Sequence, residues 1–129
     1  MRYSPARLGP ARPRPASNLE LYSWFFMRIS AVLLFFMAGF HLFYMHVIVG
    51  VDAVTFEFIS GRWESPFWRL YDLFMLLLGW LHCSNGVRIV LDDYVHSPGW
   101  RVFSKSVLYV FVALILILGS YVVLTFKPA

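Results

Sequence analysis

The stretch "LHCSNGVRIVLDDYVHSP", residues 81–98, contains polar groups that could bind a ligand, both inside an apolar run and at its end. His82 lies within the run, whereas Asp93 and Tyr94 close it. On a helix, with about 100° between successive residues, His82, Gly86 and Asp93 fall within about 40° of one another. An imidazole, a small residue and a carboxylate would therefore share one stripe. We expect this stripe to face protein and not lipid.

The composition indicates that the chain lies in a membrane. Of the 129 residues, 60% are hydrophobic and only 14% are charged, which is unlike a soluble domain of this size. A transmembrane helix needs about 20 mostly apolar residues. Three segments qualify, at about residues 29–51, 67–91 and 102–126. Because these segments use nearly the whole chain, we predict an all-α membrane protein with three transmembrane helices, part of a heteromeric helix bundle, and no catalytic residue in this chain.

The N-terminal region differs from the rest of the chain. Residues 1–17 include the run "RLGPARPRPAS", which is typical of an extended or disordered tail. We therefore divide the chain into a basic, Pro-rich cytoplasmic tail at 1–17 and a three-helix membrane anchor at 18–129. The formal charge of +4 does not predict a nucleic-acid partner, because the basic residues are not interleaved on a folded face.

Local signals predict where the helices begin and end. Ser17 stands three residues before Glu20, the spacing of a capping box, so the first helix should begin near residue 18 and run to about residue 51. Ser65 followed by Pro66 is typical of an N-cap with proline in the first turn. Pro98 should end the second helix, because proline disfavours helical geometry in the residue before it.

The distribution of basic residues predicts the orientation in the membrane. The arginines of the tail lie on the same side as three basic residues near the second connection: Arg88, Arg101 and Lys105. The other side has Arg62, Arg69 and Lys127. Because Lys and Arg accumulate on the cytoplasmic side of a membrane, the N-terminus should be cytoplasmic and the C-terminus outside. Asp93 and Tyr94 would then lie at the cytoplasmic end of the second helix.

His82 should lie well inside the membrane, about 18 Å along the helix from Tyr94 at 1.5 Å per residue. An imidazole at that depth needs a partner, because an unpaired polar group is costly in hydrocarbon. Its neutral nitrogen could ligate haem iron, with Gly86 allowing a flat macrocycle to approach closely. It could equally form a hydrogen bond across a helix interface. The residues alone leave both interpretations open.

Three further polar residues lie on the first helix. For His41, the sequence favours a structural hydrogen bond over haem ligation, and His46 is close enough to the outer end to be interfacial. Arg28 stands at the cytoplasmic entrance of the helix, where a guanidinium could hold an anionic group. A lipid phosphate is an equally good partner for Arg28.

Two short motifs resemble a known family. His82, Gly86, Asp93 and Tyr94 form H-x3-G-x6-D-Y on the second helix, and Arg28, Ser30 and Ala31 form R-x-[ST]-A on the first. Together with three spans and an N-inside topology, this resembles the smaller, D-type hydrophobic membrane-anchor subunit of succinate dehydrogenase, respiratory complex II. The resemblance covers about residues 24–126.

The resemblance implies a role for each matching residue. His82 would be an axial ligand of the iron of a b-type haem shared with a second anchor subunit, and Arg28 would lie near a haem propionate. Tyr94 would hydrogen-bond ubiquinone or menaquinone, with Asp93 shaping the quinone site. The location would be a bacterial inner membrane.

The resemblance also implies partners and an enzymatic context. The partners would be a flavoprotein subunit, an iron–sulfur subunit and a second membrane-anchor subunit, together with membrane lipid. Succinate oxidation would take place in the partner subunits, and this chain would help to form the quinone-reduction site. The alternatives are a self-contained b-type cytochrome and a non-enzymatic membrane assembly protein.

Overall fold

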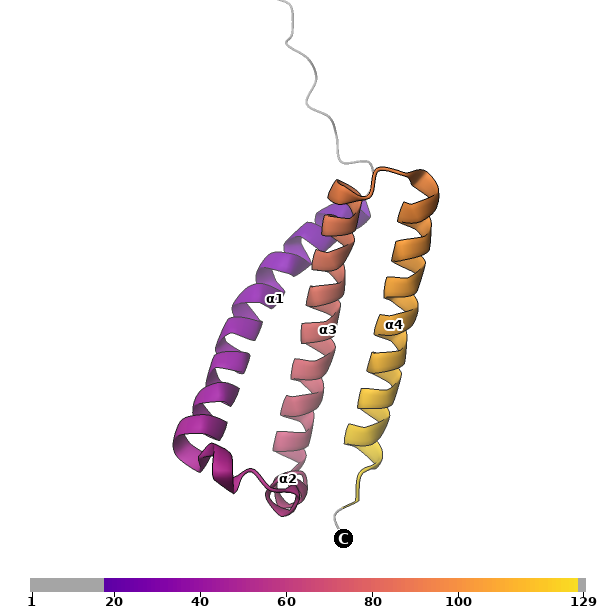
Figure 1. The fold of residues 1–129 in the computed structure, drawn as a ribbon. Coiled ribbons are helices and arrows are strands. Elements are labelled where there is room, and N and C mark those ends of the chain that lie inside the picture. The colour runs from indigo at the N-terminus through magenta and orange to yellow at the C-terminus, as the bar shows by residue number, and fades with distance from the viewer. Residues whose placement is uncertain (1–17, 128–129) are drawn as a thin grey trace, which may run out of the picture.

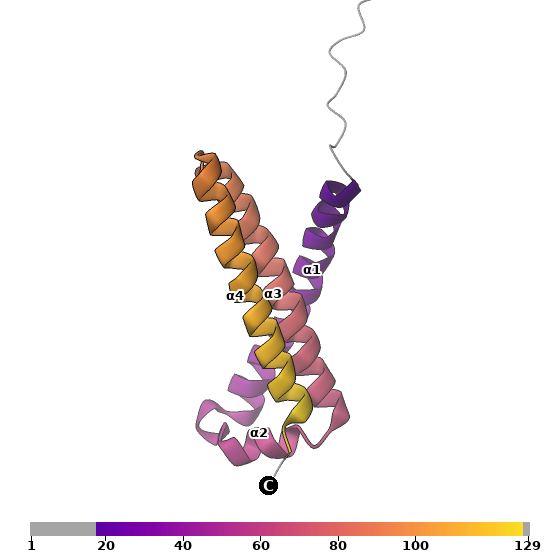
Figure 2. The ribbon, with the colours of Figure 1, turned by 90° about the vertical axis from the view of Figure 1, so that its right-hand side faces the viewer.

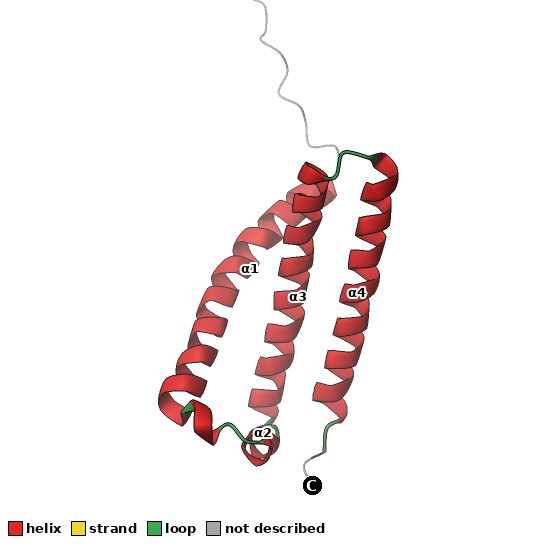
Figure 3. Ribbon diagram, viewed as in Figure 1, coloured by secondary structure: helices red, strands yellow, loops and turns green. Residues whose placement is uncertain are grey.

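The chain folds into three long helices joined by short connections (Figure 1). A computed structural model describes residues 18–127, so the predicted tail and the predicted cap at Ser17 lie outside the described residues. The long helices are α1, Asn18–Phe43, α3, Pro66–Tyr94, and α4, Pro98–Thr125. Each is long and apolar enough to cross a membrane. The predicted fold class is therefore confirmed, and within the described residues every regular element is helical (Figure 3).

The starts of α3 and α4 follow the predicted proline signals. Ser65 and Ser97 are extended, with ψ near 120° in both, and each precedes a proline in the first turn of a helix. Neither serine side chain caps its helix by a hydrogen bond. The proline geometry, and not a hydroxyl cap, therefore marks these two boundaries.

The first connection is more ordered than the sequence suggested. The α-helix α1 gives way to a π-helix, η1, at Tyr44–Val49, which is followed by a single 3₁₀ turn, η2, at Val51–Ala53. Gly50 joins them with φ of +84°, a conformation that side chains rarely adopt. A short helix, α2, then spans Phe56–Arg62, and the Thr55 hydroxyl accepts a hydrogen bond from the Phe58 amide at 3.2 Å.

Helix α3 packs against both α1 and α4. Figure 2 shows that α1 diverges from α3 and α4 toward the end where α1 begins, α3 ends and α4 begins. We call this the Tyr94 end, and the opposite end, which carries the short helix, the α2 end. At the α2 end α3 and α4 approach closely: a Cβ on Gly119 would lie 2.7 Å from Leu76 Cδ2.

Little of the apolar surface is buried within this chain. Among the described residues, the buried hydrophobic side chains are Met45, Val112 and Val123, whereas large side chains on all three long helices are exposed. In a membrane such faces meet lipid tails or neighbouring helices without a penalty. The bundle therefore leaves much apolar surface for contact with lipid or with other helices.

Candidate functional site

The predicted histidine lies at the contact between α3 and α1. His82 Nδ1 is 2.7 Å from the hydroxyl oxygen of Ser30, which is 1% exposed. One turn further along α3, Gly86 faces the same helix, since a Cβ there would meet Met27 Cε at 3.7 Å. The part of the predicted stripe made by His82 and Gly86 therefore faces protein.

The residues that close α3 have a different environment. Asp93 is exposed and Tyr94 is 78% exposed. Within residues 18–127 neither side chain forms a hydrogen bond or an ion pair. The stripe thus passes from a protein contact at His82 to an exposed position at Asp93, at the end where Figure 2 shows α1 apart from α3.

Arg28 lies on α1 near the Tyr94 end. Its guanidinium carbon is 3.6 Å from the centroid of the Trp24 ring, a cation–π contact that holds the exposed side chain against its own helix. Arg28 and Arg88 both line a small pocket of about 270 Å³ between α1 and α3. The Glu20 carboxylate lines the same pocket, so two cationic groups face one anionic group, and the net positive lining favours an anionic ligand there.

Arg88 has a structural role that the sequence analysis did not assign. It donates to Asn85 Oδ1 at 3.0 Å and to the Ser23 hydroxyl at 3.2 Å, and Ser23 donates to the same amide oxygen at 3.0 Å. This network joins α1 to α3 near the Tyr94 end. Asn85 and Arg88 are three residues apart on one helix, so their contact within α3 could have been predicted from the sequence.

A second polar cluster lies at the α2 end. Arg62 is only 8% exposed and pairs with Asp72, while its other guanidinium nitrogen contacts Met45 Sδ at 3.2 Å. The Trp63 indole also donates to Asp72 at 2.8 Å. A carboxylate in a predicted span needs a partner, so Asp72 itself was the signal by which the sequence could have revealed this cluster.

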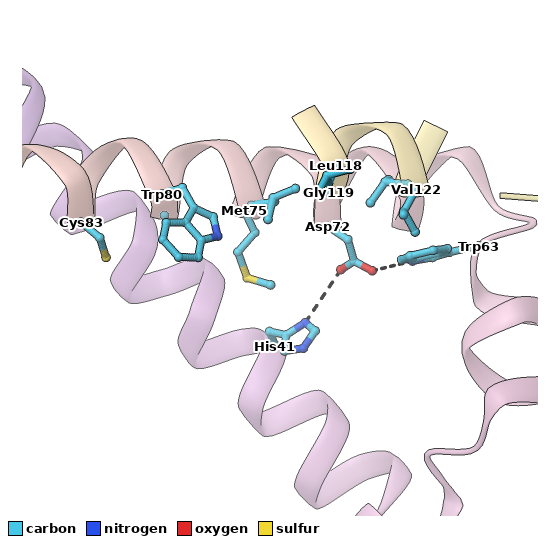
Figure 4. A pocket seen from close by; sticks show the side chains of 12 residues that line it. His41, Trp63, Asp72, Met75, Trp80, Cys83, Leu118, Gly119 and Val122 are labelled. Atoms are coloured by element: carbon cyan, nitrogen blue, oxygen red, sulfur yellow. Dashed lines mark hydrogen bonds and ion pairs between the residues drawn. The ribbon is translucent and has the colours of Figure 1, made fainter. Parts of the chain in front are cut away.

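His41 belongs to this second cluster. Its Nδ1 lies 3.9 Å from Asp72 Oδ1 (Figure 4). Its ring stacks on Tyr71 with centroids 6.5 Å apart. The distance to Asp72 is too long for a hydrogen bond, and Nδ1 of His41 has no hydrogen-bond partner among residues 18–127, so the structural hydrogen bond that the sequence favoured is not formed there by this nitrogen. The Asp72 side chain also lines an apolar pocket of about 780 Å³ between α3 and α4. His46 is exposed in the π-helix, with Nδ1 3.2 Å from the Leu42 carbonyl oxygen.

A haem would need fewer ligands from this chain than a bare metal ion. Within residues 18–127 no three His, Cys, Asp or Glu side chains are grouped closely enough to hold an ion. A porphyrin supplies most of the ligands of its iron and needs only an axial ligand from each side, which a single imidazole can provide. His82, with Nδ1 already engaged, has its other ring nitrogen for that purpose.

The chain matches a known protein family. The family model described as succinate dehydrogenase/fumarate reductase transmembrane subunit matches residues 3–121, nearly the whole chain. A search of curated proteins found no match.

Proposed function

Because the chain belongs to the succinate dehydrogenase/fumarate reductase transmembrane subunit family, we propose that it is the smaller, D-type anchor of a succinate:quinone oxidoreductase. In this proposal it holds a flavoprotein and an iron–sulfur subunit to the membrane together with a second anchor subunit. Succinate oxidation takes place in the partners. The observation that carries the proposal is His82, an imidazole inside an apolar span whose Nδ1 is fixed by Ser30.

His82 would hold the iron of a b-type haem, the other axial ligand coming from the second anchor subunit. Members of the family often bind haem b, which supplies reversible one-electron chemistry when bound. Gly86 would let a flat macrocycle approach α3 closely, provided that the flexible Met27 side chain next to it moves aside. Arg28 would contact a haem propionate, and its place with Arg88 around one pocket supports an anionic partner.

Tyr94 and Asp93 would contribute to the quinone site. Their exposure leaves the phenol and the carboxylate accessible to a molecule that enters between subunits. The Tyr94 hydroxyl would donate to a quinone carbonyl oxygen and stabilise the negative charge that develops there during reduction. Asp93, adjacent in sequence, would shape the site.

The orientation follows from the basic residues. The Tyr94 end would face the cytoplasm of a bacterial inner membrane, with the N-terminus on the same side. The iron–sulfur subunit would meet the anchor at this end, next to Tyr94. The exposed apolar faces of the three long helices would contact lipid and the second anchor subunit.

A reduced-minus-oxidised absorption spectrum of the complex, purified with its neighbouring subunits, tests the proposal. The parental complex should show a b-type haem, and His82→Ala should abolish or shift that signal. His46→Ala is the matched control, because His46 is an exposed histidine of the same chain, and it should leave the spectrum unchanged. A parental spectrum in an assembled His82→Ala complex would overturn the assignment. Haem in the chain purified alone would favour a self-contained cytochrome.

A further inference from the structure

Ser30 is buried more completely than any other described residue, although it lies in a bundle with very little interior. Its side chain is small and polar, so hydrophobic packing does not account for its position. Its hydroxyl oxygen has two close partners, the Phe26 carbonyl oxygen at 2.6 Å and His82 Nδ1 at 2.7 Å. The Met27 carbonyl oxygen is more distant, at 3.4 Å.

These two distances determine where the hydrogens lie. A serine hydroxyl has one hydrogen to donate, and a carbonyl oxygen can only accept. If that hydrogen pointed at His82, two oxygens with facing lone pairs would be held 2.6 Å apart, which is repulsive. The hydroxyl therefore donates to Phe26, and its lone pair accepts from His82. Nδ1 of His82 must carry a hydrogen.

In a neutral imidazole only one nitrogen carries a hydrogen. With Nδ1 protonated, Nε2 of His82 keeps its lone pair and is the atom able to ligate a metal. The same bond fixes the ring orientation, because Ser30 belongs to α1 and His82 to α3. Partners of this kind, beyond the metal ligands themselves, set the tautomer and basicity of ligating histidines.

We propose that Ser30 is a positioning residue for His82, which sets the Nδ1–H tautomer and presents Nε2 to haem iron. This inference rests on the proposed role of His82 as the haem ligand. Ser30 touches neither haem nor quinone in this account and acts through the imidazole alone. An accepting hydroxyl at Nδ1 also makes the imidazole a stronger electron donor, which favours the oxidised iron.

The test uses the assembled complex and measures the haem midpoint potential and the low-spin electron paramagnetic resonance signal. Ser30→Ala removes the acceptor and should raise the midpoint potential and change the signal. Ser30→Thr keeps a hydroxyl, so the midpoint potential and the signal should stay at parental values. Ser106→Ala is the matched control, because Ser106 also donates to a carbonyl four residues earlier in its helix, at 2.9 Å, and it should change neither quantity.

The outcomes separate the two proposals. A parental potential and signal in Ser30→Ala, with His82→Ala having lost its haem, would overturn the role of Ser30 and leave the haem assignment standing. A parental spectrum in His82→Ala would instead overturn the haem assignment. If Ser30→Ala does not assemble, Ser30→Cys fills the same space with a weak acceptor. It should also raise the potential, and an unchanged potential there would contradict the inference.

Discussion

Arg62 and Tyr94, at the two ends of the bundle, have opposite environments. At the α2 end, Arg62 is 8% exposed and its charge is met by Asp72 within the same chain. At the Tyr94 end, the closing tyrosine of α3 is 78% exposed and has no hydrogen-bond partner among residues 18–127. We call the first end closed, because its buried arginine is paired within the chain, and the second end open, because its closing tyrosine is accessible.

This difference indicates where the chain depends on other molecules. A buried arginine requires a partner, and the chain supplies it at the α2 end. Further contacts reinforce that end, where Arg69 donates to the Trp63 and Phe126 carbonyl oxygens at 3.0 and 3.1 Å. Exposed groups at the Tyr94 end need no partner for folding and are free to contact a ligand or a subunit. Stability should therefore respond most to changes at the α2 end, and quinone chemistry to changes at the Tyr94 end.

The largest effect on stability should come from Arg62→Met. The change leaves the Asp72 carboxylate without its cation, and breaking a buried pair by removing one partner costs about 3–5 kcal/mol. The free energy of unfolding in mild detergent would measure the loss. In the double variant Arg62→Met with Asp72→Leu, neither charge remains, so much of the stability should return. A loss below about 1 kcal/mol in the single variant would show that the α2 end is not held by this pair.

Tyr94→Phe should affect quinone reduction and not stability. If the hydroxyl donates to an oxygen that gains charge, its loss costs about 1.5–3 kcal/mol, or a roughly 10- to 150-fold lower rate of quinone reduction. Succinate oxidation with a soluble acceptor is the internal control and should be unchanged. Tyr22→Phe is a second control, because Tyr22 is an exposed tyrosine on α1 near the same end. A parental quinone rate in Tyr94→Phe would mean that Tyr94 is only a membrane-interface anchor.

Gly119→Ala tests how tightly α3 and α4 pack at the α2 end. The added methyl group would meet Leu76 Cδ2 at 2.7 Å, so the leucine side chain must move. Because the obstacle is the end of a flexible side chain, we expect a loss of about 1 kcal/mol, at the low end for overpacking. Gly39→Ala on α1 is the control, since nothing lies within 4 Å of its added Cβ. Equal stabilities of the two variants would show that α3 and α4 pack loosely around Gly119.

The smallest effect should come from Lys105→Gln near the Tyr94 end. Lys105 Nζ lies 2.5 Å from Asp92 Oδ1, but the two side chains are 26% and 34% exposed. Ion pairs this accessible to solvent contribute little to stability, because water and salt screen them. The measurement is the same detergent unfolding as for Arg62→Met. A loss as large as that of Arg62→Met would remove the contrast between the two ends.

The sequence predicted the fold well because its signals are local. Apolar length predicted the three spans, and Pro66 and Pro98 each mark the start of a helix by restricting the residue before it. The short helix α2 was missed because seven residues carry too little periodicity. The π-helix at Tyr44–Val49 was missed too, because an apolar run has the same composition in either helical form.

The site was less predictable than the fold because its contacts join different helices. His82 was identified as a polar residue that needs a partner, but spacing along one helix cannot select Ser30, which is 52 residues away. The same limit applies to Asp72 and Arg62, which lie on α3 and α2. The roles of Tyr94 and Arg28 stay predictions, since they depend on ligands and subunits outside this chain.

The closed end also has a consequence for biosynthesis. The pairing of Arg62 with Asp72 spans only ten residues, and its other contacts, with Met45 and Trp63, come from earlier in the chain than Asp72. All of these residues leave the ribosome before α4 does. The first two spans can therefore pack as a hairpin before the third span is synthesised. This shortens the time during which a charged side chain lies in the membrane without a partner. The charges that are paired first are those of the α2 end, and the contact of Arg69 with Phe126 follows once α4 is made.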